Sequence, residues 1–289
     1  MGRHPYRAAV IGRPVKHSLS PLIHNFWAER EGISARYTIC EPEDGPEGFK
    51  AAIDRLPGAG YRGANVTIPY KEYALKLADI KSDAARAIGA ANMLTFSENR
   101  IIADNSDVTG FAQSVFAAAP ALSAQRALVL GAGGAARAII VALRDIVKVN
   151  HLYLTNRSAA RAHDVAAQLH APDFSIDVVD WSVREKFIPD ADIIINTTSL
   201  GMDGQPELEL GLGEAKPTTI VSDIVYTPLK TTLLRTAARH GLATIDGLEM
   251  LMRQAVPGYL AWLGKNADVD RDLRNCLETA LRRRAEASP

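Results

Sequence analysis

The sequence has few cysteines, no excess of either charge and no long hydrophobic run. Its 289 residues include two cysteines, Cys40 and Cys276, which are far apart and form no CxxC motif. We therefore expect a reducing compartment, namely the cytoplasm. Lysine plus arginine and aspartate plus glutamate number 33 each, so no net field favours nucleic acid or an anionic membrane. No apolar run approaches membrane-spanning length, and the start MGRHPYR lacks the apolar core of a signal peptide.

The remaining composition is that of an ordinary globular protein. The seven histidines show no paired ligand spacing, so no structural metal is expected. Hydrophobic residues make up 47% and charged residues 23% of the chain, and the length suits two domains of normal size. One basic run, residues 282–284, ends the last predicted helix, where cations complement the helix dipole.

A glycine-rich turn near the middle of the chain is the most informative motif. Gly131, Ala132, Gly133, Gly134 and Ala135 follow the apolar run 127–130 and precede residues with helical spacing. A glycine in the tight turn, a second where backbone approaches a pyrophosphate, and a helix N-terminus behind them are typical of dinucleotide binding. Ala136 can serve as the third small residue. Because the turn comes so late, the first hundred residues are expected to form the substrate half.

The next strand-like run, 151–155, identifies the nucleotide. It ends at Asn156, Arg157 and Ser158, with Arg161 close behind and no acid to bind a ribose 2′-hydroxyl. Guanidinium groups suit a 2′-phosphate, which favours NADP over NAD. The alternative is that both arginines are ordinary surface residues at a strand-to-helix junction.

Strand and helix signals alternate in the first hundred residues. Ser20 followed by Pro21 predicts a helix start with Ser20 as the N-cap. The hairpin turn is expected at residues 97–99. Strands are predicted at 8–12, 37–40 and 64–67, a hairpin at 92–96 and 100–102, and helices at 46–56, 70–78 and 107–119.

From residue 126 onward the pattern predicts a parallel sheet covered on both faces. After Gly247 it is helical only, and these helices are expected to pack back on the first domain. Six strands are predicted, at 128–130, 152–155, 176–179, 192–195, 220–224 and 243–245, and two final helices at 248–263 and 270–284.

Four polar segments of the first half lie at predicted strand ends or helix starts: 17–20, 65–71, 89–92 and 104–107. Ligands of open α/β sheets bind where such segments converge, and these hydroxyls and amides suit a substrate with several hydroxyl groups. Lys71 and Asp107 could supply proton chemistry to a ketone that accepts a hydride. Each also has an ordinary alternative, because Lys71 could be solvated and Asp107 a helix N-cap.

Together these segments resemble the shikimate dehydrogenase family, and the resemblance covers nearly the whole chain. Any one motif could arise by chance, but nine in the same order are strong evidence. They are GRPVKHSLSP (12–21), NVTIPYK (65–71), GAAN (89–92), NSD (105–107), GAGGAARA (131–138), NRS (156–158), NTTSLGM (196–202), DIVYTPL (223–229) and MLMRQA (250–255).

The resemblance implies an NADP-dependent enzyme that reversibly reduces 3-dehydroshikimate to shikimate, a polyhydroxy carboxylic acid of aromatic amino-acid biosynthesis. It implies a Lys71–Asp107 catalytic pair. The implied fold is α/β: a discontinuous substrate domain of residues 1–107 and 248–289, and a Rossmann-like, doubly wound parallel-sheet NADP domain of residues 108–247. The implied substrate contacts are Ser18, Ser20, Asn65, Thr67, Asn92, Tyr226 and Gln254, and the implied cofactor contacts are Gly131, Ala132, Gly133, Gly134, Ala135, Asn156, Arg157, Ser158, Arg161, Thr198, Ser199 and Gly247.

Three positions depart from the family pattern: Met93 and Ser106 each stand where threonine is usual, and Thr197 replaces alanine. Met93 is expected to alter the wall beneath Asn92 and to loosen substrate choice. A quinate or dual quinate/shikimate dehydrogenase remains an alternative, as does a catalytically silent dinucleotide-binding sensor. Ser20 mildly favours shikimate. The chain could also form a homodimer, because the sequence alone identifies no surface patch that would decide its oligomeric state.

Overall fold

The computed structural model describes residues 6–120 and 122–287, which divide into two compact units. The first unit takes the described residues up to Ser106 and those from Gln254 onward, and the second takes Asp107–Arg253. The sequence placed these divisions at 107/108 and 247/248. The second division falls inside one continuous helix, α9 (Gly247–Leu263), where no break in the sequence pattern marks it.

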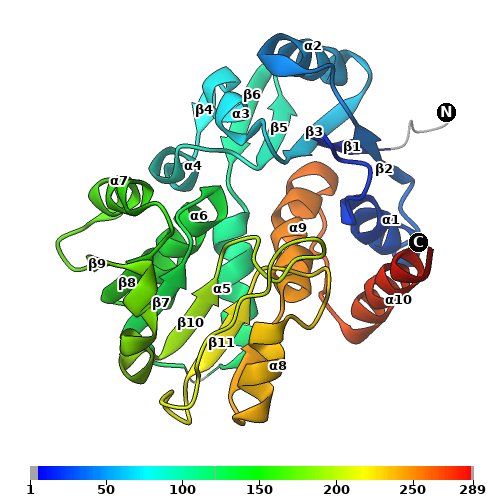
Figure 1. Cartoon of the computed structure of the whole chain (residues 1–289). Helices are drawn as coiled ribbons and strands as arrows, with labels where there is room; N and C mark the ends of the chain where they lie inside the picture. The colour runs from blue at the N-terminus through cyan, green and yellow to red at the C-terminus, as the bar shows by residue number, and fades with distance from the viewer. Residues whose placement is uncertain (1–5, 121, 288–289) are drawn as a thin grey trace. The chain divides into compact units, whose positions relative to one another are not determined.

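The first unit is built on a six-stranded mixed sheet in the order β2-β1-β3-β5-β6-β4 (Figure 1). β1 pairs in parallel with β2 and β3, whereas β5 runs antiparallel to β3 and β6. The strands are β1 (Tyr6–Ile11), β2 (Ala35–Cys40), β3 (Tyr61–Val66), β4 (Ile80–Lys81), β5 (Met93–Ser97) and β6 (Arg100–Asp104). The helices are α1 (Ser20–Arg30), α2 (Gly45–Gly58), α3 (Lys71–Leu77), α4 (Asp83–Ile88), α9 from Gln254, and α10 (Arg271–Ala287).

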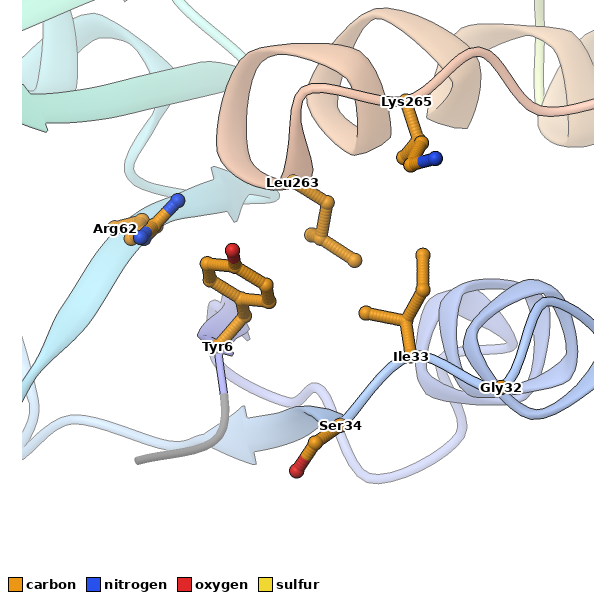
Figure 2. A pocket seen from close by; sticks show the side chains of 7 residues that line it. All are labelled: Tyr6, Gly32, Ile33, Ser34, Arg62, Leu263 and Lys265. Atoms are coloured by element: carbon orange, nitrogen blue, oxygen red, sulfur yellow. The ribbon is translucent and has the colours of Figure 1, made fainter. Parts of the chain in front are cut away.

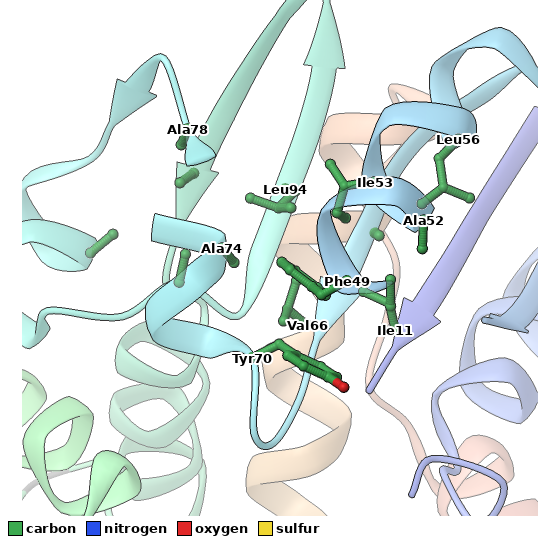
Figure 3. Packing of buried hydrophobic residues seen from close by; sticks show 14 residues of the cluster. Ile11, Phe49, Ala52, Ile53, Leu56, Val66, Tyr70, Ala74, Ala78 and Leu94 are labelled. Carbon is green, nitrogen blue, oxygen red and sulfur yellow. The ribbon is translucent and has the colours of Figure 1, made fainter. Parts of the chain in front are cut away.

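Apolar residues cover both faces of this sheet, because successive strand residues point to opposite sides. One face, with Ile11 and Val66, packs under α2 and α3, where Tyr70 stacks on Phe49 with ring centroids 4.7 Å apart (Figure 3). The opposite face includes Val10, Tyr37, Met93 and, from α9, Trp262. The indole Nε1 of Trp262 donates to the Leu94 carbonyl at 3.1 Å, which ties α9 to this sheet.

The hairpin of β5 and β6 confirms the sequence prediction. Its two turn residues, Glu98 and Asn99, have φ of 50° and 59°, the left-handed conformation that tight hairpin turns require. The short elements β4 and α4 were not anticipated from the sequence.

The second unit has a six-stranded, fully parallel sheet in the order β12-β11-β10-β7-β8-β9, which confirms the predicted doubly wound fold (Figure 1). α5 packs on α6, and α8 packs on β11 and β12. The strands are β7 (Arg126–Leu130), β8 (His151–Thr155), β9 (Ser175–Val179), β10 (Ile193–Asn196), β11 (Ile220–Asp223) and β12 (Ala243–Ile245). The helical elements are α5 (Asp107–Ala118), α6 (Gly134–Ala142), η1 (Leu143–Val147), α7 (Ala159–Leu169), η2 (Trp181–Asp190), α8 (Thr232–Arg239) and the first part of α9.

The start of α1 corrects one prediction. Ser20 is the first helical residue and Leu19 occupies the cap position, so the assignment of Ser20 as N-cap is wrong. The reason is that the Ser18 hydroxyl accepts the N–H of Ser20 at 3.2 Å, the role that was expected of Ser20. Asp107 is likewise the first residue of α5, where a carboxylate suits the positive end of the helix dipole. Within the described ranges, no helix is both long and apolar enough to cross a membrane.

Candidate active site

The glycine turn after β7 has the geometry that a pyrophosphate requires. Gly131 has φ of +112°, which side-chain-bearing residues rarely adopt, and any side chain there would collide with the Thr197 hydroxyl at the end of β10. Gly133 and Gly134 differ, because a Cβ at either would meet no atom within 4 Å. The backbone at these two positions is therefore open to an approaching phosphate.

α6 begins directly behind this turn, so its N-terminal N–H groups and positive dipole end meet that open backbone. Ala136 is fully buried, which lets the helix pack closely on the sheet. β7 and β10 are neighbours in the sheet although β8 follows β7 in the chain, so the turn lies at the topological switch point where α/β sheets bind ligands. The turn therefore fits a dinucleotide.

The turn after β8 presents cations rather than acids. The Asn156 side chain donates from Nδ2 to the Ser158 carbonyl at 2.9 Å and so holds the turn. Arg157 and Arg161 are exposed, and residues 156–161 contain no aspartate or glutamate. This arrangement fits a nucleotide that carries a 2′-phosphate.

A cavity of about 290 Å³ lies beyond the carboxyl ends of β10 and β11. Its lining includes the predicted cofactor residues Thr198 and Ser199 together with Tyr226, a predicted substrate residue. α9 begins beside it at Gly247, where any side chain would collide with the Ile224 carbonyl oxygen. Glycine at this position thus serves the close approach of α9 to the loop after β11.

Two buried residues, Asn196 and Asp223, hold these loops, although the sequence analysis assigned neither of them a role. The Asn196 side chain donates from Nδ2 to Asp223 Oδ1 at 2.9 Å, and its Oδ1 accepts from the Thr198 backbone and hydroxyl at 3.0 and 2.7 Å. Asp223 also accepts from the Thr231 hydroxyl at 2.7 Å and from the Val225 N–H at 3.0 Å. Both residues fall within the NTTSLGM and DIVYTPL motifs, so their presence there was the available signal.

Asp223 should make the stability of the fold depend on pH. Burial raises the pKa of its carboxyl to about 6, and the hydrogen bonds that it accepts oppose this rise only in part. In the window between the ordinary aspartate pKa of 3.8 and about 6, the folded protein binds a proton that the unfolded chain releases. The contribution of this carboxyl is therefore complete below the window and is lost as pH rises through about 6.

Asp223→Asn cannot titrate, so we expect the free energy of unfolding of wild type relative to this variant to fall as pH rises across that window. Urea titrations at a series of pH values measure the difference. Two stability curves that stay parallel throughout the window would contradict the assignment.

In the first unit, main-chain hydrogen bonds join the segments that carry predicted substrate residues. Thr67 donates its N–H to the carbonyl of Ile11 at the end of β1, at 2.9 Å. The Lys71 carbonyl accepts from Ala91 at 2.9 Å, and the Asn92 carbonyl accepts from Val66 at 2.8 Å. The turn after β3, the start of α3 and the segment before β5 are thereby brought together.

A buried amide–hydroxyl chain continues from this point. Asn92 is 3% exposed and accepts at Oδ1 from the N–H and hydroxyl of Ser106, at 2.7 and 3.2 Å. The Ser106 hydroxyl also lies 3.4 Å from Oε1 of Gln254, which is buried on α9. Serine at 106 thus supplies the bonding hydroxyl that the usual threonine would supply.

The remaining predicted residues are distributed over both units. Ser18 and Ser20 lie at the start of α1, and Lys71 begins α3, all in the first unit. Asp107 follows Ser106 directly and begins α5 in the second unit, to which Tyr226 also belongs. Because Lys71 and Asp107 belong to different units, their action as a catalytic pair is a proposal.

Comparison with known proteins identifies the chain. Residues 10–94 match the profile described as shikimate dehydrogenase substrate binding domain, and residues 111–202 match that described as shikimate / quinate 5-dehydrogenase. A protein of Jannaschia sp. named shikimate dehydrogenase (NADP(+)) is 45% identical over 274 residues, which cover 93% of this chain and 96% of that one. The chain belongs to the shikimate dehydrogenase family.

Solved structures support this membership of the shikimate dehydrogenase family. The shikimate 5-dehydrogenase of Thermus thermophilus, in complex with NADP(H) and shikimate, has a TM-score of 0.82 at 32% identity over 96% of this chain and 99% of that one. The quinate dehydrogenase of Corynebacterium glutamicum, in complex with NAD, has a TM-score of 0.88 at 26% identity over 95% and 99% of the two chains. The fold alone thus accommodates different substrates and nucleotides.

Met93, one of the departures from the family pattern, lies in the core of the first unit. Met93 is 7% exposed and packs with Val10, Tyr37 and Trp262 in the cluster on the α9 side of the sheet. It pairs across the sheet with Asn65. Its side chain therefore forms part of the core that supports Tyr37, and its effect on substrate choice stays a prediction.

A second, larger cavity of about 560 Å³ lies on the first unit of this family member, at the amino ends of β1 and β3 (Figure 2). Arg62 lies 4.0 Å over the Tyr6 ring at its edge, and Leu263 and Ile33 point into it. None of the predicted site residues lines it, and Ser18 and Thr67 follow the opposite, carboxyl ends of these strands. Within the described residues, no group of three His, Cys, Asp or Glu side chains could hold a metal ion.

Proposed function

We propose that this chain catalyses the reversible, NADP-dependent reduction of 3-dehydroshikimate to shikimate. The observation that carries the proposal is 45% identity over 93% of the chain to an enzyme named for this activity. Two structural features support it: the open glycine turn with arginines after the next strand, and the polar segments joined at the strand ends of the first unit. We place the enzyme in the cytoplasm, where Cys40 and Cys276 would remain free thiols.

In this mechanism the residues of the first unit bind and orient a polyhydroxy acid. Ser18, Thr67 and the amide nitrogens of Asn65 and Asn92 bond its hydroxyl and carboxylate oxygens. Bound NADPH supplies the hydride. As the ketone oxygen gains negative charge, the Lys71 ammonium donates a proton to it, and Asp107 orients that ammonium and stabilises its charge. In the reverse direction Lys71 accepts the proton from the substrate hydroxyl.

Quinate is the second candidate substrate, because the quinate dehydrogenase structure superposes with a TM-score of 0.88. Initial rates with shikimate and with quinate, each with NADP⁺ and with NAD⁺, separate the two. We expect the highest kcat/KM for shikimate with NADP⁺. A higher value for quinate would overturn the substrate assignment. If neither compound were turned over, the remaining explanation would be that the protein is a non-catalytic dinucleotide-binding sensor. A monomer and a homodimer are both compatible with these observations, and analytical ultracentrifugation distinguishes them.

The nucleotide assignment leads to a prediction for Arg157. Arg157→Ala should weaken NADP⁺ binding and leave NAD⁺ almost unaffected, because only the 2′-phosphate uses the guanidinium. One charge-assisted pair is worth about 1.5–3 kcal/mol, roughly 10- to 150-fold in affinity, and we expect the lower end because Arg161 compensates in part. Isothermal titrations of both nucleotides measure the change. Arg239→Ala, at the end of α8, serves as the control for removal of an exposed arginine in this unit. Equal losses for both nucleotides would contradict the NADP assignment.

A further inference from the structure

The side-chain amide of Asn65 has a single orientation in the structure. Its Nδ2 lies 3.3 Å from the main-chain carbonyl oxygen of Asn92, an atom that can only accept a hydrogen bond. The nitrogen must therefore face Asn92. Consequently Oδ1 faces the Tyr37 hydroxyl, which donates to it at 2.7 Å. A reversed amide would place two acceptors against each other at Asn92.

Helix α1 holds Tyr37 in place through two consecutive residues. The Tyr37 N–H donates to Asn25 Oδ1 at 2.9 Å, and Asn25 Nδ2 donates back to the Tyr37 carbonyl at 3.0 Å. The His24 ring stacks on the Tyr37 ring with centroids 4.1 Å apart and planes 6° from parallel. Because burial lowers the pKa of His24 to about 3, this partner is a neutral ring near neutral pH.

The Tyr37 hydroxyl is also a permanent donor. The residue is 5% exposed, and burial raises the pKa of its phenol well above the usual value. Hydrogen bonding with Asn65 and Ser20 lowers this pKa only in part, so the phenol keeps its proton. An Asn65 amide anchored in this way keeps one N–H on Asn92, and its second N–H, which has the neutral His24 ring as a neighbour, can donate to a ligand.

We propose that Tyr37 is a positioning residue that fixes the Asn65 amide so that Nδ2 donates to the substrate. The inference rests on the function proposed above and adds a residue that has no role in it. It also requires that the substrate atom at Asn65 accept a hydrogen bond, as the oxygen of a hydroxyl or of a carboxylate does.

Tyr37→Phe keeps the stacked ring and removes only the hydroxyl. We expect KM for shikimate to rise about 5- to 20-fold, because Oδ1 loses its donor and only the longer bond to Asn92 still holds the amide, while KM for NADP⁺ changes by less than about twofold. Tyr61→Phe is the matched control, since Tyr61 lies on β3 and its hydroxyl bonds Thr38 and Arg7 at 3.0 and 3.2 Å. That variant should leave both KM values unchanged.

A double-mutant cycle separates positioning from general damage. Asn65→Ala alone should raise KM for shikimate, and adding Tyr37→Phe to it should change KM no further, because Tyr37 acts only through Asn65. An unchanged KM in Tyr37→Phe would overturn the proposal. So would an equal effect of Tyr37→Phe in the presence and in the absence of Asn65.

A readout without turnover keeps this test independent of the proposed function. In ¹⁵N-labelled protein, the side-chain amide signals of Asn65, assigned by their loss in Asn65→Ala, should shift in Tyr37→Phe and stay in place in Tyr61→Phe. Signals that do not move in Tyr37→Phe would refute the anchor. Failure of the wild-type enzyme to oxidise shikimate would instead refute the proposed function, and the amide signals would still decide the role of Tyr37.

Discussion

Replacement of Lys71 by methionine should lower kcat by about 10²–10⁴-fold, the usual contribution of a positioned proton donor. Lys71 begins α3 in the first unit, so NADP⁺ affinity should stay nearly unchanged. Steady-state rates and NADP⁺ titrations measure the two effects. Lys76→Met, further along α3 and exposed, removes a similar charge away from the helix start and serves as the control. A Lys71 variant that retained more than about a tenth of wild-type kcat would remove this residue from the mechanism.

Asp107→Asn should lower kcat by a comparable factor, because it keeps the shape of the side chain and loses the charge that supports Lys71. Adding it to Lys71→Met should make the enzyme little worse than the worse single variant, since residues that act as a unit are non-additive. Single and double variants are compared by kcat under saturating substrate. Asp83→Asn removes a carboxylate from the first turn of α4 and controls for a loss of helix-dipole stabilisation. Losses that multiply fully would show that Lys71 and Asp107 act independently.

The nucleotide half of the site could be predicted from sequence because its signals are local. The turn after β7, with its strand before and its helix behind, occupies consecutive residues, and Gly131 has a φ of +112°, which favours glycine. The parallel sheet of the second unit could be predicted for the same reason, since each of its strands is an apolar run between two segments of helix length. The hairpin at Glu98 and Asn99 was equally local.

The sequence is least informative where two local solutions compete, which made the Ser20 N-cap prediction wrong, and where a boundary has no local mark. Ser18 and Ser20 both offer a hydroxyl at the start of α1, and only the folded backbone shows that Ser18 accepts the N–H. The division of the units inside α9 interrupts no helical pattern. Asn196 and Asp223 stood in motifs of the family, yet their roles depend on a bond between residues 27 positions apart.

By itself the sequence determined the family and the α/β fold, and it predicted the residues that carry the chemistry, because motif order and period-dependent apolar patterns are properties of the linear chain. Only the tertiary structure decided how those residues are held. The hydroxyl of Tyr37 on β2 reaches Asn65 on β3 across the intervening strand β1, and the backbone of Ser106 fixes the amide of Asn92. Such directional bonds exist only once separate strands and helices are packed, and they decide whether an amide presents its nitrogen or its oxygen to a ligand.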